Sequence, residues 1–159
     1  MFTSTKGIVL RTYPFKEKMC ISRVFTRNTG IESFIVKKVK NQLILTQSLN
    51  MVDLVFKKKN TSNLLFVKEA QVDYVYQSLN LKVEKIQTSI VLCEILNKIV
   101  KEKNPELYDF VTTSLQWLDQ SVKCHIGFNS LFLIKLCDFV GISPSVYSDD
   151  NPSVPKFLN

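Results

Sequence analysis

Glycine, proline and long apolar runs are scarce in this sequence. Only 4 Gly and 5 Pro occur among its 159 residues, so the chain contains no collagen-like or low-complexity segment. No stretch approaches the roughly 18 consecutive apolar residues of a membrane-spanning helix. The first residues include Lys6 and Arg11 and no apolar core, which argues against a signal peptide. We therefore expect a cytoplasmic protein without a membrane partner.

Paired cysteine motifs are also absent. The four cysteines are Cys20, Cys93, Cys124 and Cys137, and none belongs to a Cys-x-x-Cys motif or has a histidine pair nearby. The sequence therefore predicts free thiols, no zinc and no cofactor. His125 is the only histidine, and adjacent residues such as Cys124 and His125 rarely present both side chains to one substrate. Because no Gly-rich phosphate loop occurs either, we predict that the protein is not an enzyme.

The charge is distributed unevenly along the chain. The formal net charge is +7. Residues 1–80 hold 13 Lys and Arg against 5 Asp and Glu, whereas residues 81–159 hold 8 against 9. The entire excess of +8 therefore lies in the first half and the second half has −1. A one-sided positive field favours a polyanionic partner such as nucleic acid, although a solvated lysine-rich surface is the simpler alternative.

Five runs of β-forming residues occupy the first half. Alternation is clearest over residues 19–26, where Cys20, Ser22 and Val24 share one face. Residues 28–30 and the polar residues 57–63 are typical of hairpin turns. The expected strands are residues 8–12, 19–26, 31–40, 49–56 and 64–72. Five strands in so short a stretch predict a small closed barrel.

The second half has helical periodicity instead. Apolar residues recur at three- and four-residue steps and predict an amphipathic helix that ends near Lys103. Asn104 and Pro105 suit the N-cap and first position of a second helix. A third helix is expected over residues 129–140. It is apolar nearly all round and so expected to be buried, with Gly141 as its C-cap.

These patterns predict an α+β protein, with a small barrel over residues 1–78 and a helical domain over residues 79–159 packed against it. If the five strands form an oligonucleotide-binding (OB) barrel, its binding site can be placed on the sequence. OB barrels bind oligonucleotides along strands 2 and 3, between the loop joining strands 1 and 2 and the loop joining strands 4 and 5. Ten cations fall on these segments: Lys16, Lys18, Arg23, Arg27, Lys37, Lys38, Lys40, Lys57, Lys58 and Lys59. We predict that they contact DNA phosphates.

Single-strand binding also needs flat faces on which bases stack. Tyr13, Phe15 and Phe34 are the candidates, and Phe15 stands out because it lies in a polar loop. We predict that Tyr13 and Phe15 stack on bases; for Phe15, filling the barrel end is the alternative. Three further rings lie among apolar residues and are expected in the core: Phe25, Phe56 and Phe66.

Several segments together share the order and spacing of a known family. They are Thr5–Thr12, Glu17, Val24–Thr26, Gly30, Val36–Lys40, Leu49–Leu54 and Val67–Ala70. This pattern resembles the RecO family of bacterial recombination mediators. The resemblance is densest over residues 5–73 and continues through the helices to residues 141–144.

The resemblance implies an OB barrel followed by a helical domain in a bacterial, nucleoid-associated protein. It implies binding of single- and double-stranded DNA and annealing of complementary strands. Its implied partners are RecR, RecA and the acidic C-terminal tail of the single-stranded DNA-binding protein, for which Lys123 and Lys135 are possible contacts. Lys37 and Lys40 match basic positions of the family, whereas Lys38 stands where the family has glycine.

Two departures from the family pattern are visible. RecO proteins are usually longer, so the helical domain is expected to be incomplete relative to the family. Some members carry zinc-binding cysteines after the Gly-x-x-Pro turn, but residues 145–150 here contain none. A small-barrel module that binds an acidic protein remains the alternative function, because the same lysines would serve it.

Overall fold

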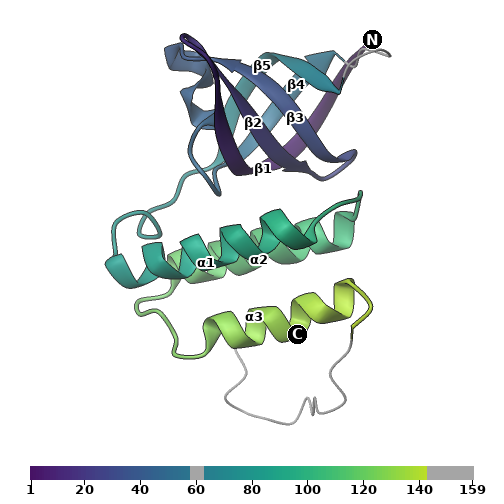
Figure 1. Cartoon of the computed structure of the whole chain (residues 1–159). Coiled ribbons are helices and arrows are strands. Elements are labelled where there is room, and N and C mark those ends of the chain that lie inside the picture. Colours follow the sequence, from purple (N-terminus) through teal and green to yellow (C-terminus); the bar gives the residue numbers. More distant parts are fainter. Residues whose placement is uncertain (58–62, 143–159) are drawn as a thin grey trace.

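The computed structural model describes residues 1–57 and 63–142, which form a β-barrel followed by three helices. The elements, in chain order, are β1 (Phe2–Lys16), β2 (Met19–Thr26), β3 (Gly30–Lys37), the 3-10 helix η1 (Lys40–Leu45), β4 (Met51–Lys57), β5 (Leu64–Tyr74), α1 (Val83–Ile99), α2 (Pro105–Gln120) and α3 (Phe128–Phe139). Figure 1 shows three tiers, with the barrel on one side, α1 and α2 in the middle and α3 outermost.

The strands close in the order β1-β2-β3-β5-β4. Strand β1 is long enough to pair with two strands: its first half pairs with β4 and its second half pairs with β2. All pairs are antiparallel except β3 with β5. This is the five-stranded Greek-key order of the OB-fold. The predicted fold class, an OB barrel followed by helices, is confirmed.

The barrel interior follows from the alternation of the strands. Cys20 and Val24 of β2 and Phe34 of β3 are almost completely buried, and they pack inside with residues of β4 and β5. The rings of Phe34 and Phe56 meet edge to face with centroids 5.1 Å apart. Because side chains of a strand alternate between its faces, the intervening residues are left on the outer surface of the barrel.

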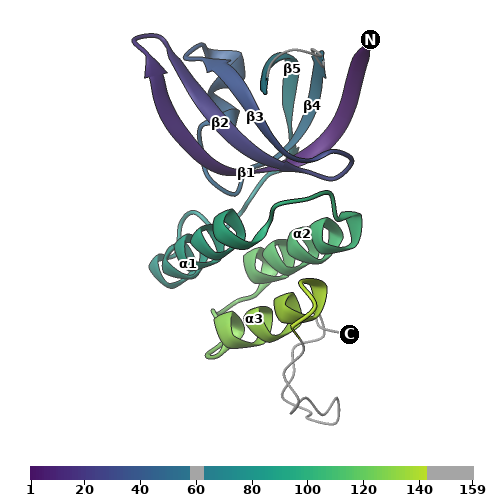
Figure 2. The same ribbon diagram turned by 45° about the vertical axis from the view of Figure 1, so that its right-hand side comes forward.

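A second core joins the barrel to the helices. Ile8 and Leu10 of β1 and Phe25 of β2 pack with buried residues of α1 and α2. Phe25 meets Tyr108 of α2 edge to face at 5.5 Å between centroids. Figure 2 shows α1 and α2 lying side by side beneath one end of the barrel. Strands β1 and β2 therefore have apolar residues on both faces, because one face lies in the barrel core and the other lies in the core shared with the helices.

The segment between β5 and α1 is fixed by two buried charged residues. The Asp119 carboxylate at the end of α2 accepts from the backbone N–H groups of Gln77, Ser78 and Leu79. Burial alone would raise the pKa of Asp119, but these N–H donors together bring it below its usual value. The ammonium of Lys85, whose pKa is lowered by burial, donates to the carbonyl of Asp119 at 2.9 Å.

Three sequence expectations need correction. The third strand ends at Lys37, and residues 40–45 form η1, whose Leu45 is buried in the barrel core. Helix α1 ends at Ile99 and not near Lys103. Helix α3 was expected to be buried, but in it only Phe128, Phe132 and Leu136 are buried; among the described elements it packs against α1 and α2.

The caps of the helices follow the sequence signals. Asn104 accepts a hydrogen bond from the N–H of Leu107 at 2.9 Å, and Pro105 opens α2. Gly141 has a φ of +77°, the left-handed conformation of a helix C-cap. Gly30 (φ +85°) closes the predicted hairpin turn, and a Cβ there would lie 2.7 Å from the backbone nitrogen of Lys103. The turn thus needs glycine both for its φ and for its contact with the helical part.

Candidate nucleic-acid interface

A row of apolar and aromatic side chains crosses the outside of the barrel. Cross-strand register pairs Tyr13 with Ile21, Ile21 with Ile35, and Ile35 with Phe66. We call these four residues the outer band. Tyr13 and Phe66 are 39% and 48% exposed, and the two isoleucines are half-buried. Directly paired residues of neighbouring strands point to the same face, so the four side chains form one continuous surface.

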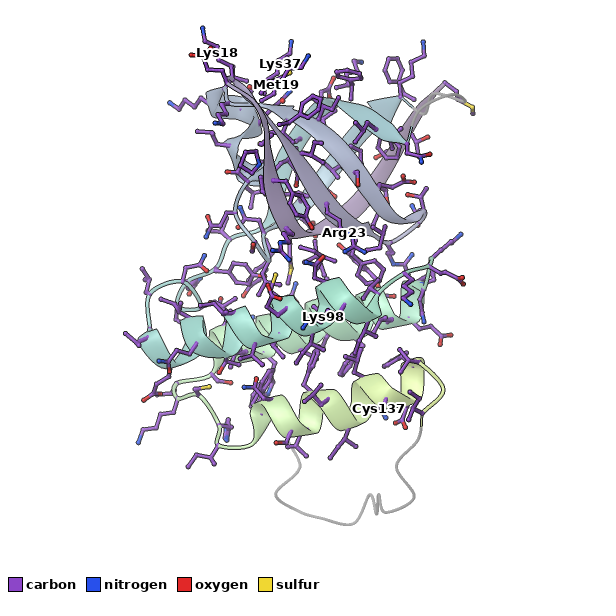
Figure 3. The ribbon with its side chains drawn as sticks, in the orientation of Figure 1. Lys18, Met19, Arg23, Lys37, Lys98 and Cys137 are labelled. Carbon is purple, nitrogen blue, oxygen red and sulfur yellow. The ribbon has the colours of Figure 1, made fainter. Side chains whose placement is uncertain are left out.

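Four lysines border this band at the barrel end remote from the helices. Lys16 pairs with Met19, and Met19 with Lys37. The backbone N–H of Lys38 donates to the carbonyl of Lys18 at 3.0 Å, which brings the β1–β2 turn against the end of β3. Figure 3 shows Lys18 and Lys37 at this end, far from α1. Lys16, Lys18, Lys37 and Lys38, all exposed, are called the lysine rim.

The remaining predicted lysines fall around this rim. Lys40 is exposed at the start of η1, two residues beyond Lys38. Lys57 is exposed at the end of β4 and is the cross-strand partner of Phe66. It therefore lies beside the outer band on the side opposite Tyr13. Lys58 and Lys59 lie outside the described residues.

The aromatic predictions have mixed outcomes. Tyr13 and Phe15 are exposed, and Phe15 (41%) does not fill the barrel end. Lys16 lies over the Phe15 ring with its Nζ 5.5 Å from the centroid. Phe34, considered for stacking, is completely buried, and Phe66, expected in the core, lies on the surface. Alternation within β3 and β5 explains both corrections, since Ile35 and Phe66 share the outer face.

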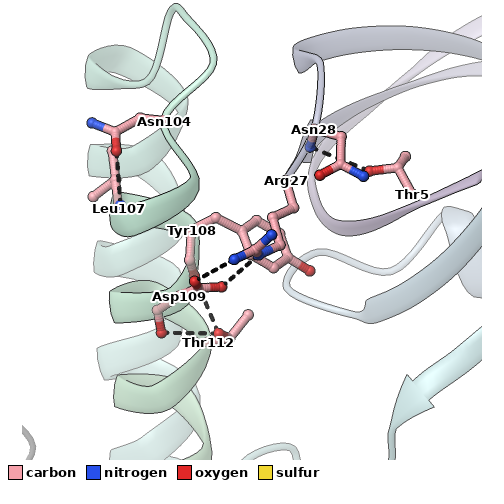
Figure 4. A network of polar contacts seen from close by, with 8 residues as sticks. All are labelled: Thr5, Arg27, Asn28, Asn104, Leu107, Tyr108, Asp109 and Thr112. Carbon is pink, nitrogen blue, oxygen red and sulfur yellow. Dashed lines mark hydrogen bonds and ion pairs between the residues drawn. The ribbon is translucent and has the colours of Figure 1, made fainter.

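Arg23 and Arg27 lie at the seam between barrel and helices and not on the lysine rim. Arg23 Nη1 donates to Asn97 Oδ1 at 2.7 Å and to the Asn97 carbonyl at 2.9 Å. Figure 4 shows Arg27 paired with Asp109 of α2 through two hydrogen bonds of 2.8 Å. The hydrogen bond to Arg27 lowers the pKa of the Asp109 carboxyl. Both arginines join the barrel to the helices, and their predicted contact with DNA stays a prediction.

The opposite outer face of the barrel has mixed and mostly paired charges. Strands β4 and β5 carry Asp53, Glu69 and Asp73 there, Lys6 of β1 is paired with both aspartates, and Lys68 is paired with Glu69. The hydrogen bond that Lys6 donates to the Asp73 carboxylate raises the pKa of Lys6. The positive charge of Lys6 is balanced by these two aspartates, whereas the β1–β2 turn that carries Lys16 and Lys18 holds a single carboxylate, Glu17. On charge alone, the rim side of the barrel is therefore the more favourable of the two faces for a polyanion.

Features that would suggest other activities have structural explanations. Cys124 shares a hydrogen bond of 3.3 Å with Thr88, and the His125 ring lies 5.0 Å from that of Trp117, so the two neighbours face different partners. All four cysteines are free thiols. Among the described residues, no three His, Cys, Asp or Glu side chains are grouped closely enough to hold a metal ion. None of the helices in that part of the chain is long and apolar enough to cross a membrane.

The topology and the site together define an OB-fold protein with a helical part packed beneath the barrel. Models of known families match both parts: "Recombination protein O N terminal" over residues 1–76 and "Recombination protein O C terminal" over residues 84–151. The chain belongs to the RecO family of DNA repair proteins.

Curated relatives agree with this assignment. The chain is 29% identical over 152 residues to the DNA repair protein RecO of Phocaeicola vulgatus, covering 91% of this chain and 63% of that one. It is 27% identical over 160 residues to the protein of the same name from Flavobacterium psychrophilum, covering 96% and 67%. With that of Azobacteroides pseudotrichonymphae it shares 30% over 152 residues, covering 91% and 63%. The chain thus spans about two thirds of the length of these relatives.

Proposed function

We propose that this chain binds single-stranded DNA across the outer band and the lysine rim, without catalysing a reaction. One observation carries the proposal: exposed Tyr13 and Phe66 lie in one cross-strand row that the rim lysines border. Bases stack on such rings whatever their sequence, and lysines neutralise the phosphates between them. The interface would therefore show little sequence preference and a strong dependence on salt.

Membership of the RecO family supports a wider role in recombinational DNA repair in the bacterial cytoplasm, at the nucleoid. We propose that the chain also binds double-stranded DNA and anneals complementary strands, because neutralised phosphates repel one another less. It would assist the loading of RecA together with RecR. We propose that the two parts of the chain have different roles. Residues 1–78 bind DNA. Residues 79–159, which have almost no net charge, bind proteins such as the tail of the single-stranded DNA-binding protein.

The salt dependence of binding to a fluorescent oligo-dT tests the DNA proposal. If both lysines contact phosphates, Lys37→Ala/Lys38→Ala should make the log–log slope shallower by about 1.4, since each contact with a single strand contributes roughly 0.7. Lys123→Ala/Lys135→Ala is the matched control, because it removes the same charge from the helical part, and its slope should equal that of the wild type. Equal slopes for both variants, or no binding at low salt, would contradict the proposal.

Substitution of the aromatic side chains distinguishes DNA binding from the alternative function, a module that binds an acidic protein. Tyr13→Ala and Phe15→Ala should each weaken oligo-dT binding by about 1 kcal/mol, because stacking on the base is lost. Binding of a poly-glutamate peptide depends on the lysines and should be unchanged in these variants. An equal loss for both ligands would favour the alternative.

A further inference from the structure

A cavity of about 440 Å³ opens between β1, the loop that precedes β4, and helix α1. Its walls are apolar where Leu10 and Leu49 of the barrel side face Ile86 and Ile90 of α1. The amides of Gln47 and Asn80 also line it. Ile90 is 60% exposed, so the apolar wall of α1 is left open to solvent at the mouth of the cavity.

The barrel-side wall of the cavity is rigidly held. Leu49 has a φ of +66°, a conformation that costs a branched side chain roughly 1–2 kcal/mol. It is fixed from both sides, since its N–H donates to the carbonyl of Val9 and its carbonyl accepts from Tyr76 Oη at 2.7 Å. Cys93 of α1 donates to the carbonyl of Leu10 across the cavity floor at 2.9 Å. The cavity is therefore formed before any ligand binds.

Two arginines connect the outer band to this cavity. Arg11 lines the cavity, and its guanidinium lies 5.3 Å from the centroid of the Tyr13 ring. Arg11 and Arg23 are direct cross-strand partners, an arrangement of like charges that is unfavourable until an anion joins them. Asn97 holds Arg23 Nη1 in place. Glu94 also lines the cavity, so a phosphate is favoured at the arginines and disfavoured inside.

We propose that a DNA strand bound along the outer band continues over Arg11 and Arg23 and places one nucleobase in this cavity. The phosphate lies at the paired arginines, and the base is inserted between the walls formed by Leu49 and Ile90. The amides of Gln47 and Asn80 offer both donors and acceptors, so any of the four bases can be accommodated. This proposal rests on the proposed function, because it extends the same DNA path from the barrel to α1.

A length series of fluorescent oligo-dT tests the extension. A strand of about four nucleotides is long enough for the outer band alone, and one of about twelve also reaches the cavity, within the range of site sizes known for OB barrels. Ile90→Glu places a carboxylate at the cavity mouth without disturbing the core, because the side chain is 60% exposed. It should weaken binding of the longer strand about tenfold, because a carboxylate replaces the apolar wall that the base contacts, and leave the shorter strand unchanged.

Val83→Glu is the matched control, since it makes the same change on an exposed residue of α1 away from the cavity lining. It should leave the preference for the longer strand intact. A second measurement places 4-thiothymidine at successive positions of the longer strand and maps photo-crosslinks by mass spectrometry. One end position should crosslink to the peptide that contains Ile86, Ile90 and Cys93, and interior positions to β1, β2 and β3.

The outcomes separate the two proposals. Unchanged binding of the longer strand by Ile90→Glu, with crosslinks on the barrel alone, would overturn the cavity assignment and leave the outer band as the DNA site. Equal weakening by Ile90→Glu and Val83→Glu would also overturn it, because added charge would then explain the loss. Failure of the wild type to bind either strand would overturn both.

Discussion

The two ends of the barrel carry similar residues but have different surroundings. At the remote end, Lys37 and Lys38 are exposed next to exposed aromatic rings. At the near end, Arg23 and Arg27 are engaged by Asn97 and Asp109 of the helices. We expect the exposed lysines of the remote end to contribute more to DNA binding than Arg27, whose guanidinium is already paired with Asp109.

The largest effect is expected from the core at the near end. Phe25→Ala should lower the free energy of unfolding by about 4 kcal/mol, because the ring is fully buried against Tyr108 and its loss leaves a cavity. Phe15→Ala, at the exposed remote end, should change it by less than about 0.5 kcal/mol. Urea denaturation measures both. A single transition is expected, since one core joins barrel and helices, and two separate transitions would contradict that view.

Asp119→Asn should lower the free energy of unfolding by roughly 3 kcal/mol, because buried N–H groups lose a charged acceptor. The pKa of Asp119 is lower in the folded than in the unfolded protein, so its contribution is present above the unfolded pKa of about 4. It is lost as the pH falls through the folded pKa. Urea midpoints between pH 7 and pH 3 should fall less steeply in Asp119→Asn than in the wild type. Exposed Glu102→Gln is the control and should follow the wild-type curve.

A smaller effect is expected at the outer band. Phe66→Ala should weaken oligo-dT binding by about 1 kcal/mol, the lower end of what a stacked base contributes. Phe66→Leu keeps an apolar side chain without an aromatic face, and it should weaken oligo-dT binding by the same amount as Phe66→Ala. Fluorescence anisotropy at fixed salt measures both. Full affinity in Phe66→Leu would show that apolar contact and not stacking is what Phe66 provides.

The smallest effect is expected from Arg27. Arg27→Gln should leave the salt dependence of DNA binding unchanged, because its guanidinium is paired with Asp109. The pKa of Asp109 should rise toward its ordinary value in this variant, since the hydrogen bond that lowers it is lost, and NMR titration of the carboxyl detects this. Lys38→Gln at the remote end is the comparison and should make the slope shallower by roughly 0.7. Equal changes in slope would remove the distinction between the two ends.

The sequence was informative wherever a local rule applied. Alternation located β2 at the predicted residues, and the N-cap Asn104 with Pro105 marked the start of α2. The expectation failed where the surroundings decide. Phe66 was assigned to the core because its neighbours are apolar, but which face of β5 is inside depends on its parallel pairing with β3, which is a long-range contact. Helix η1 has no periodic signal because it is only six residues long.

By itself, the sequence determined the class of fold, the succession of five strands and three α-helices along the chain, the turn at Gly30 and the concentration of positive charge in the first half of the chain. These properties depend on residues that are close together in the chain. Only the tertiary structure decided which cations remain exposed, which aromatic rings form the outer band, and where the cavity beside α1 opens. Each depends on side chains contributed by distant segments, because the free-energy cost of burying or exposing a charge or an aromatic ring is set by the groups that pack against it.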